Sequence, residues 1–131
     1  MTFRQLLPLA TLIALSADVL CPTVGRSAGS DDGQVAFNNA CRTCHALREG
    51  DNRLGPNLYK IIGRKAGSVP NYGYSSAMKE ADLLWDKATL DRFITNPDQV
   101  VSGNKMKPFG GLASTEERAK IIAFLEASGG S

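Results

Sequence analysis

Cys41, Cys44 and His45 lie within five residues of one another, and this Cys-x-x-Cys-His motif contains the only histidine of the 131-residue chain. Two thiols three residues apart can add to the two vinyl groups of one haem, while the adjacent imidazole binds its iron. The motif therefore predicts covalent haem attachment through Cys41 and Cys44, with His45 as the first iron ligand.

Three other uses of these residues compete with haem attachment. A structural zinc site needs four protein ligands, and the third cysteine, Cys21, lies in a segment that we expect to be removed. A thioredoxin-like redox pair would begin a helix within a β-α-β unit, but no alternating, strand-like run flanks Cys41. A structural disulfide between Cys41 and Cys44, in a protein without haem, stays open as an alternative.

The start of the chain has the features of a secretory signal. A positively charged beginning precedes an apolar core over residues 6–17, and small residues around positions 25–30 suit cleavage. The apolar run is too short to span a membrane comfortably. We therefore expect a signal peptide over residues 1–29, a single domain over residues 30–131 and export to the periplasm, with an uncleaved anchor as the alternative.

The size and charge of the remaining chain limit its function. Removal of residues 1–29 leaves 13 basic and 12 acidic side chains, a net charge of +1. This balance argues against nucleic acid as a partner, because such proteins usually carry a strong basic excess. About one hundred residues suffice for one small domain, whose modest core benefits from a covalent staple such as an attached haem.

Helical signals alternate with two long irregular segments. Apolar spacing and capping residues predict four helices, at residues 31–42, 75–82, 86–95 and 114–128. Glycine, proline and asparagine interrupt the pattern elsewhere, mainly over residues 46–73 and 98–113. We find no alternating run long enough for a sheet. Irregular segments of this length are uncommon unless they are functional, and wrapping a large flat cofactor would explain them.

A second iron ligand has to come from a residue other than histidine. Methionine is the usual choice in an electron carrier, because its soft thioether favours ferrous iron. Met1 leaves with the signal, so Met78 and Met106 remain. Met106 lies in a glycine-flanked loop that can bring a side chain onto a metal, whereas Met78 falls in a helical stretch where core packing is the commoner use. Met106 is thus the favoured ligand, and Met78 is its rival.

Several further motifs occur in register with the cysteines. Over residues 31–128 the chain resembles the class I c-type cytochromes, the family of mitochondrial cytochrome c and its soluble bacterial relatives. The matching runs are Gly33 with Phe37, Gly55-Pro56-Asn57-Leu58, Ile62-Gly63-Arg64-Lys65, Tyr72-Gly73-Tyr74, Trp85, Thr89-Leu90, Asn96-Pro97, Gly103-x-Lys105-Met106 and Ile122-Ala123-Phe124-Leu125. Their order and spacing are far more specific than the pentapeptide alone.

The resemblance implies a fold and a ligand set. The fold would be all-α, the small cytochrome c fold, with about four to five short helices and long loops wrapped around one covalently bound haem. Gly33 would let the first and last helices cross closely beside Phe37 and Phe124. The site residues that it implies are His45 and Met106 as axial ligands, Cys41 and Cys44 as thioethers, the carbonyl of Pro56 as acceptor for His45, Tyr74 and Trp85 as donors to a haem propionate, and Arg64 as its counter-charge.

The chain departs from the family pattern near the expected methionine ligand. Phe93 stands where the family commonly has a tyrosine that bonds the sulfur, and Met78 stands where it often has an asparagine. Both changes should make the pocket drier and alter the reduction potential. Asn104 replaces the usual threonine, and one extra residue separates Met106 from Phe109, the counterpart of the aromatic residue that shields the haem edge.

The function implied by the resemblance is one-electron transfer in the periplasm, not enzymatic catalysis. A monomer would dock transiently on membrane redox complexes, such as a bc-type complex or cytochrome oxidase, or on periplasmic dehydrogenases. Lysines near the haem edge, namely Lys60, Lys79, Lys105 and Lys107, could steer this docking, although solubility is a competing role for them. A five-coordinate haem enzyme or gas sensor is the alternative if Met106 does not bind the iron.

Overall fold

The computed structural model describes residues 28–129. The predicted signal peptide, apart from its last two residues, lies outside this range, and so does Cys21. Cleavage of the signal peptide therefore stays a prediction. Within residues 28–129, none of the helices has the length and apolar character needed to cross a membrane.

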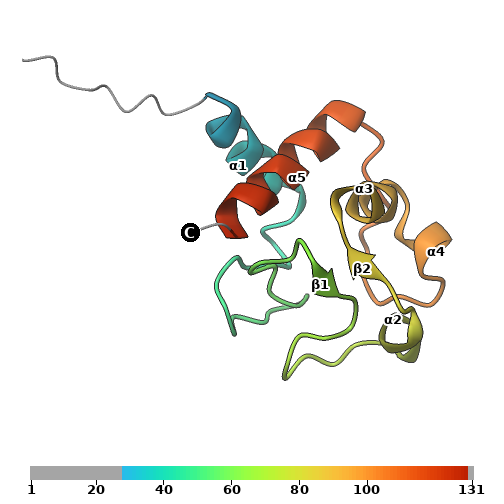
Figure 1. The fold of residues 1–131 in the computed structure, drawn as a ribbon. Coiled ribbons are helices and arrows are strands. Elements are labelled where there is room, and N and C mark those ends of the chain that lie inside the picture. Colours follow the sequence, from blue (N-terminus) through green and yellow to red (C-terminus); the bar gives the residue numbers. More distant parts are fainter. Residues whose placement is uncertain (1–27, 130–131) are drawn as a thin grey trace, which may run out of the picture.

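The described part of the chain is built from short helices joined by long irregular segments (Figure 1). The helices are α1 (Ala28–Ala40), α2 (Ser76–Glu80), α3 (Lys87–Thr95), α4 (Pro97–Val100) and α5 (Thr115–Gly129), and the strands are β1 (Arg64–Lys65) and β2 (Leu84–Trp85). This composition confirms the predicted all-α class, and the five helices match the four to five that the resemblance implies.

Three helices begin at side chains that accept hydrogen bonds from backbone N–H groups of the first helical turn. Ser75, Asp86 and Ser114 each accept a hydrogen bond from the backbone N–H three residues on, at 3.1, 2.6 and 3.2 Å. Such caps satisfy donors that have no partner inside the helix. The predicted beginnings of α2, α3 and α5 are therefore confirmed.

Helix α1 spans Ala28–Ala40 and not the predicted residues 31–42, and two small elements also differ from the sequence-based expectation. Asn96-Pro97 ends α3 as predicted, but Asn96 also caps α4, because its side chain accepts from the N–H of Gln99 at 3.3 Å and proline suits a first helical position. The expectation of no sheet is also wrong, since β1 and β2 pair antiparallel, with Arg64 opposite Trp85. Strands of two residues are too short to produce a detectable alternation.

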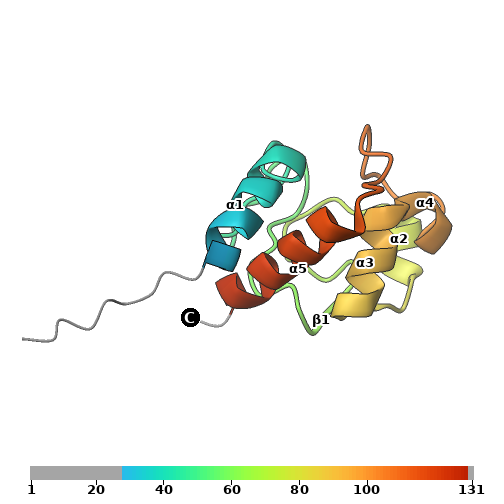
Figure 2. The same cartoon turned by 90° about the horizontal axis from the view of Figure 1, so that it is seen from above.

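Helices α1 and α5 cross at a glycine. They lie side by side in two perpendicular views (Figures 1 and 2). A β-carbon on Gly33 would come within 2.7 Å of the carbonyl oxygen of Lys120 and 2.8 Å of the β-carbon of Phe124. Beside this contact the rings of Phe37 and Phe124 pack with centroids 5.5 Å apart. The predicted close crossing is confirmed, and it depends on the missing side chain.

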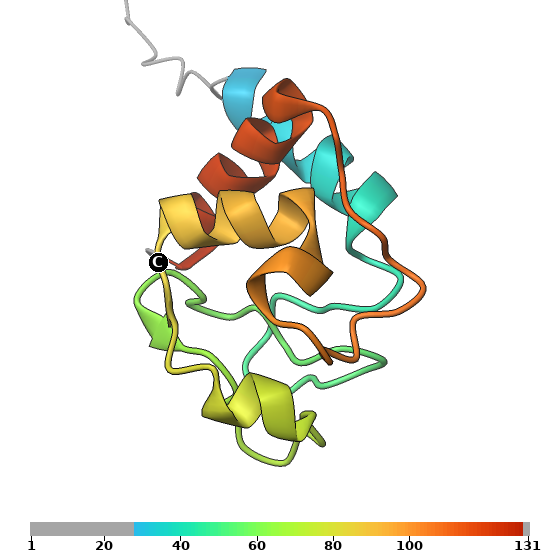
Figure 3. The same cartoon turned by 90° about the vertical axis from the view of Figure 1, so that its right-hand side faces the viewer.

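The segment between α4 and α5 is tied back to the helices at its far end. Figure 3 shows it, in orange, running along one side of the molecule from α4 to the start of α5. The guanidinium of Arg118, whose side chain is only 8% exposed, pairs with Asp91 of α3 at 2.7 Å and donates to the carbonyls of Leu112 and Ala113 at 2.8 and 2.7 Å. One buried side chain therefore joins α3, α5 and the segment that contains Met106.

We predict that Gly33→Ala destabilises the protein by about 1–2 kcal/mol. Helix propensity alone would stabilise α1 by about 1 kcal/mol, but overpacking against backbone atoms that cannot rotate away costs about 1–3 kcal/mol or more. Guanidinium unfolding of the haem-loaded protein measures the difference. Gly110→Ala is the control, because a β-carbon there meets nothing within 4 Å. A Gly33→Ala protein as stable as the wild type would contradict the predicted helix contact.

Candidate haem site

One cavity gathers all the predicted site residues. Its empty space is about 1150 Å³, open solvent at the mouth included, and its walls are mostly apolar. The predicted site residues that line it are Cys41, Cys44, His45, Pro56, Arg64, Tyr74, Trp85 and Met106. Met78, the rival ligand, lines it as well.

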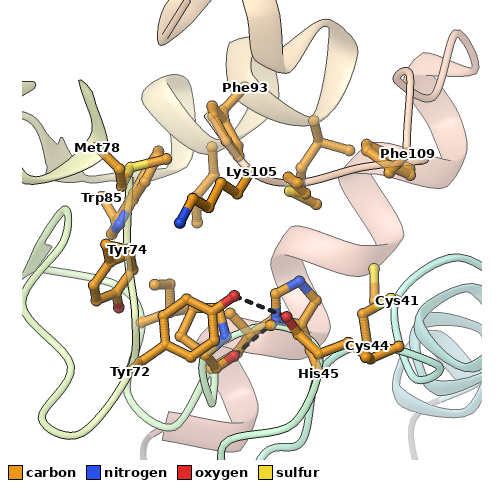
Figure 4. A pocket seen from close by; sticks show the side chains of 18 of the residues that line it. Cys41, Cys44, His45, Tyr72, Tyr74, Met78, Trp85, Phe93, Lys105 and Phe109 are labelled. Atoms are coloured by element: carbon orange, nitrogen blue, oxygen red, sulfur yellow. Dashed lines mark hydrogen bonds between the residues drawn. The ribbon is translucent and has the colours of Figure 1, made fainter. Parts of the chain in front are cut away.

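His45 is buried and held in one orientation. Its Nδ1 lies 2.7 Å from the carbonyl oxygen of Pro56, and because a carbonyl can only accept, Nδ1 carries the proton. The other ring nitrogen, Nε2, keeps its lone pair and points into the cavity (Figure 4). Burial lowers the pKa of His45, against the opposing effect of this hydrogen bond. The imidazole is thus neutral and oriented, which is the form that binds a metal.

Glycine at position 55 makes room for this ring. A β-carbon there would lie 2.3 Å from Cε1 of His45, closer than any unbonded contact allows. Backbone hydrogen bonds fix this approach, from Gly55 N–H to the carbonyl of Cys44 and from Leu58 N–H to the carbonyl of Ala46, both at 2.8 Å. These bonds therefore hold the loop that supplies the Pro56 carbonyl against the Cys-x-x-Cys-His motif.

The two cysteines lie on a helical turn that continues beyond α1. The N–H of Cys41 donates to Phe37, and the N–H groups of Cys44 and His45 both donate to the carbonyl of Cys41, at 2.8, 3.1 and 3.0 Å respectively. Residues three apart on such a turn share a face, and both cysteines line the cavity without forming a disulfide. Burial and the neighbouring Cys44 raise the pKa of the Cys41 thiol to about 11.

The segment that contains Met106 forms the facing wall. Lys105 and Phe109, which flank Met106 in the chain, lie across the cavity from His45 (Figure 4). Met78 instead lies beside Trp85 and Tyr74 (Figure 4), buried in the short helix α2. Of the two methionines, Met106 thus belongs to the wall that faces the imidazole.

Polar groups gather along another part of the wall. Arg64 donates to the carbonyls of Asn57 and Tyr59 at 2.7 and 2.9 Å, and its pairing with Trp85 in the β1–β2 ladder brings both residues to the cavity. The hydroxyl of Tyr74 accepts a bond from the N–H of Val69 at 3.3 Å, so its own proton can still be donated. Burial raises the pKa of Tyr74, which keeps that proton in place.

Phe93 occupies the position of the family tyrosine. Its ring packs edge-on against Trp85 with centroids 5.0 Å apart, and it lines the cavity as an apolar group.

Tyr72 also lines the cavity, although it is not among the predicted site residues. Its hydroxyl donates to the carbonyl of Leu54 at 2.8 Å, and its ring meets that of Tyr74 edge-on at 4.8 Å. Its position two residues before Tyr74 was the available signal, because alternate residues of an extended segment share a side.

The four lysines expected near the haem edge separate into two pairs. Lys105 and Lys107 line the cavity. Lys60 lies over the ring of Tyr59, with Nζ 5.3 Å from the centroid, and Lys79 belongs to α2, close to Gly67. Only the first pair is therefore brought to the cavity.

Known proteins match the chain over most of the described domain. The family model described as "Cytochrome C oxidase, cbb3-type, subunit III" matches residues 28–125. Cytochrome c of Euglena viridis is 37% identical over 97 residues, which are 74% of this chain and 94% of that protein. The chain belongs to the class I c-type cytochromes. Cytochrome c2 of Rhodomicrobium vannielii is 44% identical to this cytochrome over 94 residues, 71% of this chain and 74% of that protein.

A solved structure supports the same assignment. Cytochrome cH from Methylobacterium extorquens superposes on the cytochrome with a TM-score of 0.69 and 34% identity, covering 75% of this chain and 97% of that one. The cytochrome therefore carries one covalently bound haem c, for which Cys41 and Cys44 supply the attachment motif, and it is an electron-transfer haem protein.

The geometry of the cavity fits this cofactor. An apolar space of the right order is bounded by the cysteine turn, and Nε2 of a neutral imidazole points into it. A guanidinium and a tyrosine hydroxyl stand where an anionic substituent could be held. The residues that contact the space therefore offer attachment, ligation and charge compensation together.

We predict that Gly55→Ala displaces the imidazole and destabilises the haem-loaded protein by about 3 kcal/mol or more, because the new methyl group would overlap the ring of His45. Absorption spectra and guanidinium unfolding measure the two effects. Gly73→Ala, where a β-carbon has nothing within 4 Å, should leave both unchanged. An unperturbed Gly55→Ala spectrum would refute the close approach of residue 55 to the ring.

Proposed function

We propose that this cytochrome is a periplasmic one-electron carrier whose haem iron is bound by His45 and Met106. The observation that carries the proposal is the placement of the two residues. Nε2 of His45 points into the cavity, and the segment with Met106 forms the wall across from it. A thioether on that side favours ferrous iron and so raises the reduction potential.

The chain's residues would set the conditions for electron transfer. The bound haem supplies the one-electron chemistry. The Pro56 carbonyl holds the proton of His45 and makes the imidazole a better electron donor. Phe93, Met78 and the other apolar walls exclude water, which limits solvent reorganisation when the charge changes. If His45 and Met106 both bind the iron, a substrate would find no open coordination site on it, which supports a carrier and not an enzyme.

Three residues would hold one haem propionate. Arg64 presents a half-buried guanidinium, which keeps its proton under ordinary conditions. Tyr74 and Trp85 present a hydroxyl and an indole N–H to the same cavity. A buried carboxylate needs such partners, because its burial without them is costly.

The proposed partners are membrane redox complexes, such as a bc-type complex or a cytochrome oxidase, and periplasmic dehydrogenases. The description of the matched family model names an oxidase subunit, which supports an oxidase among them. Lys105 and Lys107 at the cavity could steer transient docking of a monomer. A signal peptide over residues 1–29, ahead of a domain over residues 30–131, would deliver the protein to the periplasm.

Replacement of the two methionines tests the ligand set. The ferric wild type should show the weak near-infrared band of a sulfur–iron bond. We predict that Met106→Ala abolishes this band and that Met78→Ala, the matched control, retains it, because Met106 faces His45 and Met78 lies beside Trp85. A high-spin wild-type spectrum at neutral pH would favour the five-coordinate enzyme or sensor instead, and loss of the band in Met78→Ala alone would reverse the assignment.

Removal of the proposed counter-charge tests the propionate site. We predict that Arg64→Leu lowers the reduction potential by about 60 mV. Coulomb's law gives about 1.4 kcal/mol for a unit charge at a separation on the order of 12 Å and an effective dielectric constant near 20, which corresponds to about 60 mV for one electron. Redox titration measures the change.

Lys65→Leu is the control for this titration. Lys65 is the neighbouring residue of β1, but it is exposed and pairs with Asp82 at 3.2 Å, so its removal should shift the potential far less. Equal shifts in the two variants would mean that Arg64 acts only as one of many surface charges.

A further inference from the structure

Asn104 holds the backbone of the residue that we assign as the second iron ligand. The N–H of Met106 donates to Oδ1 of Asn104 at 2.9 Å. The amide nitrogen of Asn104 donates in turn to the carbonyl of Val101 and to Oδ1 of Asp98, both at 2.9 Å. Asn104 is only 6% exposed, so every polar atom of its side chain is used inside the fold.

Asp98 extends the same network to the other side of Met106. Its second oxygen, Oδ2, accepts a hydrogen bond from Nζ of Lys107. One carboxylate therefore holds a residue two positions before the methionine and another directly after it. The bond from Lys107 is the main cause of the lowered pKa of Asp98, so the carboxylate is ionised near neutral pH.

The position of the Asp98 carboxylate is fixed by the helix to which it belongs. Asp98 lies in α4, which Asn96 caps, and the preceding Pro97 is among the most deeply buried side chains of the described chain. The position of Asp98 is thus set by packing and not by the loop that it holds.

We propose that Asn104, Asp98 and Lys107 form a clamp that keeps Met106 in place as an iron ligand and limits how often its thioether leaves. The proposal rests on the His45 and Met106 ligation given above. Asn104 does not line the cavity, so it acts through Met106 and is a positioning residue.

The two arms of the clamp should contribute unequally. The pair of Asp98 and Lys107 is exposed, at 56% and 52% of the side-chain surfaces, and exposed ion pairs contribute little because water and salt screen them. The bonds of Asn104 are buried, and loss of one partner there leaves other polar groups unsatisfied. Asn104 should therefore dominate, and the clamp should depend only weakly on salt.

Imidazole binding to the ferric, haem-loaded protein measures how often the thioether leaves. At saturating imidazole the rate equals the rate at which the sixth ligand dissociates. We expect Asn104→Ala to raise this rate roughly tenfold, the factor that corresponds to about one hydrogen bond. Asp98→Ala should raise it about threefold, and Lys107→Gln less. Glu116→Gln is the matched control, because it removes an exposed carboxylate paired with Lys120 at 2.8 Å on α5, and it should leave the rate unchanged.

A second background separates positioning from general loosening of the fold. When Met106→Ala is already present, addition of Asn104→Ala should no longer change the imidazole rate, since the two effects share one interaction. Exchange of the Met106 amide hydrogen should also become faster in Asn104→Ala. An unchanged rate in the wild-type background, or an equal acceleration with and without Met106, would overturn the clamp.

The outcomes distinguish this proposal from the function on which it rests. If the wild type shows the near-infrared sulfur band but Asn104→Ala leaves the imidazole rate unchanged, the clamp alone is overturned. A wild type without that band, and with the same imidazole rate as Met106→Ala, overturns the ligand assignment and the clamp with it. If Asn104→Ala does not accumulate with haem, Asp98→Ala replaces it in each comparison, since its side chain is exposed and its removal leaves the core intact.

Discussion

The hydrogen bond from His45 to the carbonyl of Pro56 is the constraint on which the rest of the site depends. It can form only because residue 55 has no side chain and because backbone bonds lace the loop to Cys44 and Ala46. The same bond decides which ring nitrogen is free, so it orients the only histidine of the chain for the iron binding that we propose. Without it, the cysteines would attach a haem whose iron lacked a fixed partner.

The loop that contains Pro56 also positions the polar residues of the cavity wall. Arg64 donates to the carbonyls of Asn57 and Tyr59, which lie one and three residues after Pro56 in the chain. Its backbone then pairs with Trp85 in the short β1–β2 ladder. A two-residue ladder contributes little stability by itself, but here it fixes the register between the histidine loop and the indole. The geometry of the proposed propionate site thus follows from the geometry of the imidazole.

Much of this arrangement could be predicted from the sequence, for reasons visible in particular residues. The cysteine motif is local, so its chemistry is determined by spacing alone, and capping residues such as Ser75 and Asp86 mark helix starts within one turn. Asn104 and Arg118 could not be recognised in the same way. Asn104 bonds Asp98 and Met106, which are near in the chain but lie in a segment without a repeating pattern. Arg118 pairs with Asp91, which is 27 residues away and meets it only by tertiary contact. Besides Tyr72, helix α4 had an unused local signal, since asparagine followed by proline begins helices as well as ending them.

The two walls of the cavity are built on different physical principles. The histidine side is fixed by backbone hydrogen bonds, which survive most side-chain changes, whereas the methionine side is fixed by the side chains of Asn104 and Arg118. Phe93 supplies no hydroxyl to a sulfur, unlike the tyrosine common in the family. In this chain polar support for the proposed ligand therefore lies at the backbone N–H of Met106 and not at its sulfur. Support at the backbone restrains the position of the ligand without withdrawing electron density from it, so ligand stability and reduction potential can vary separately.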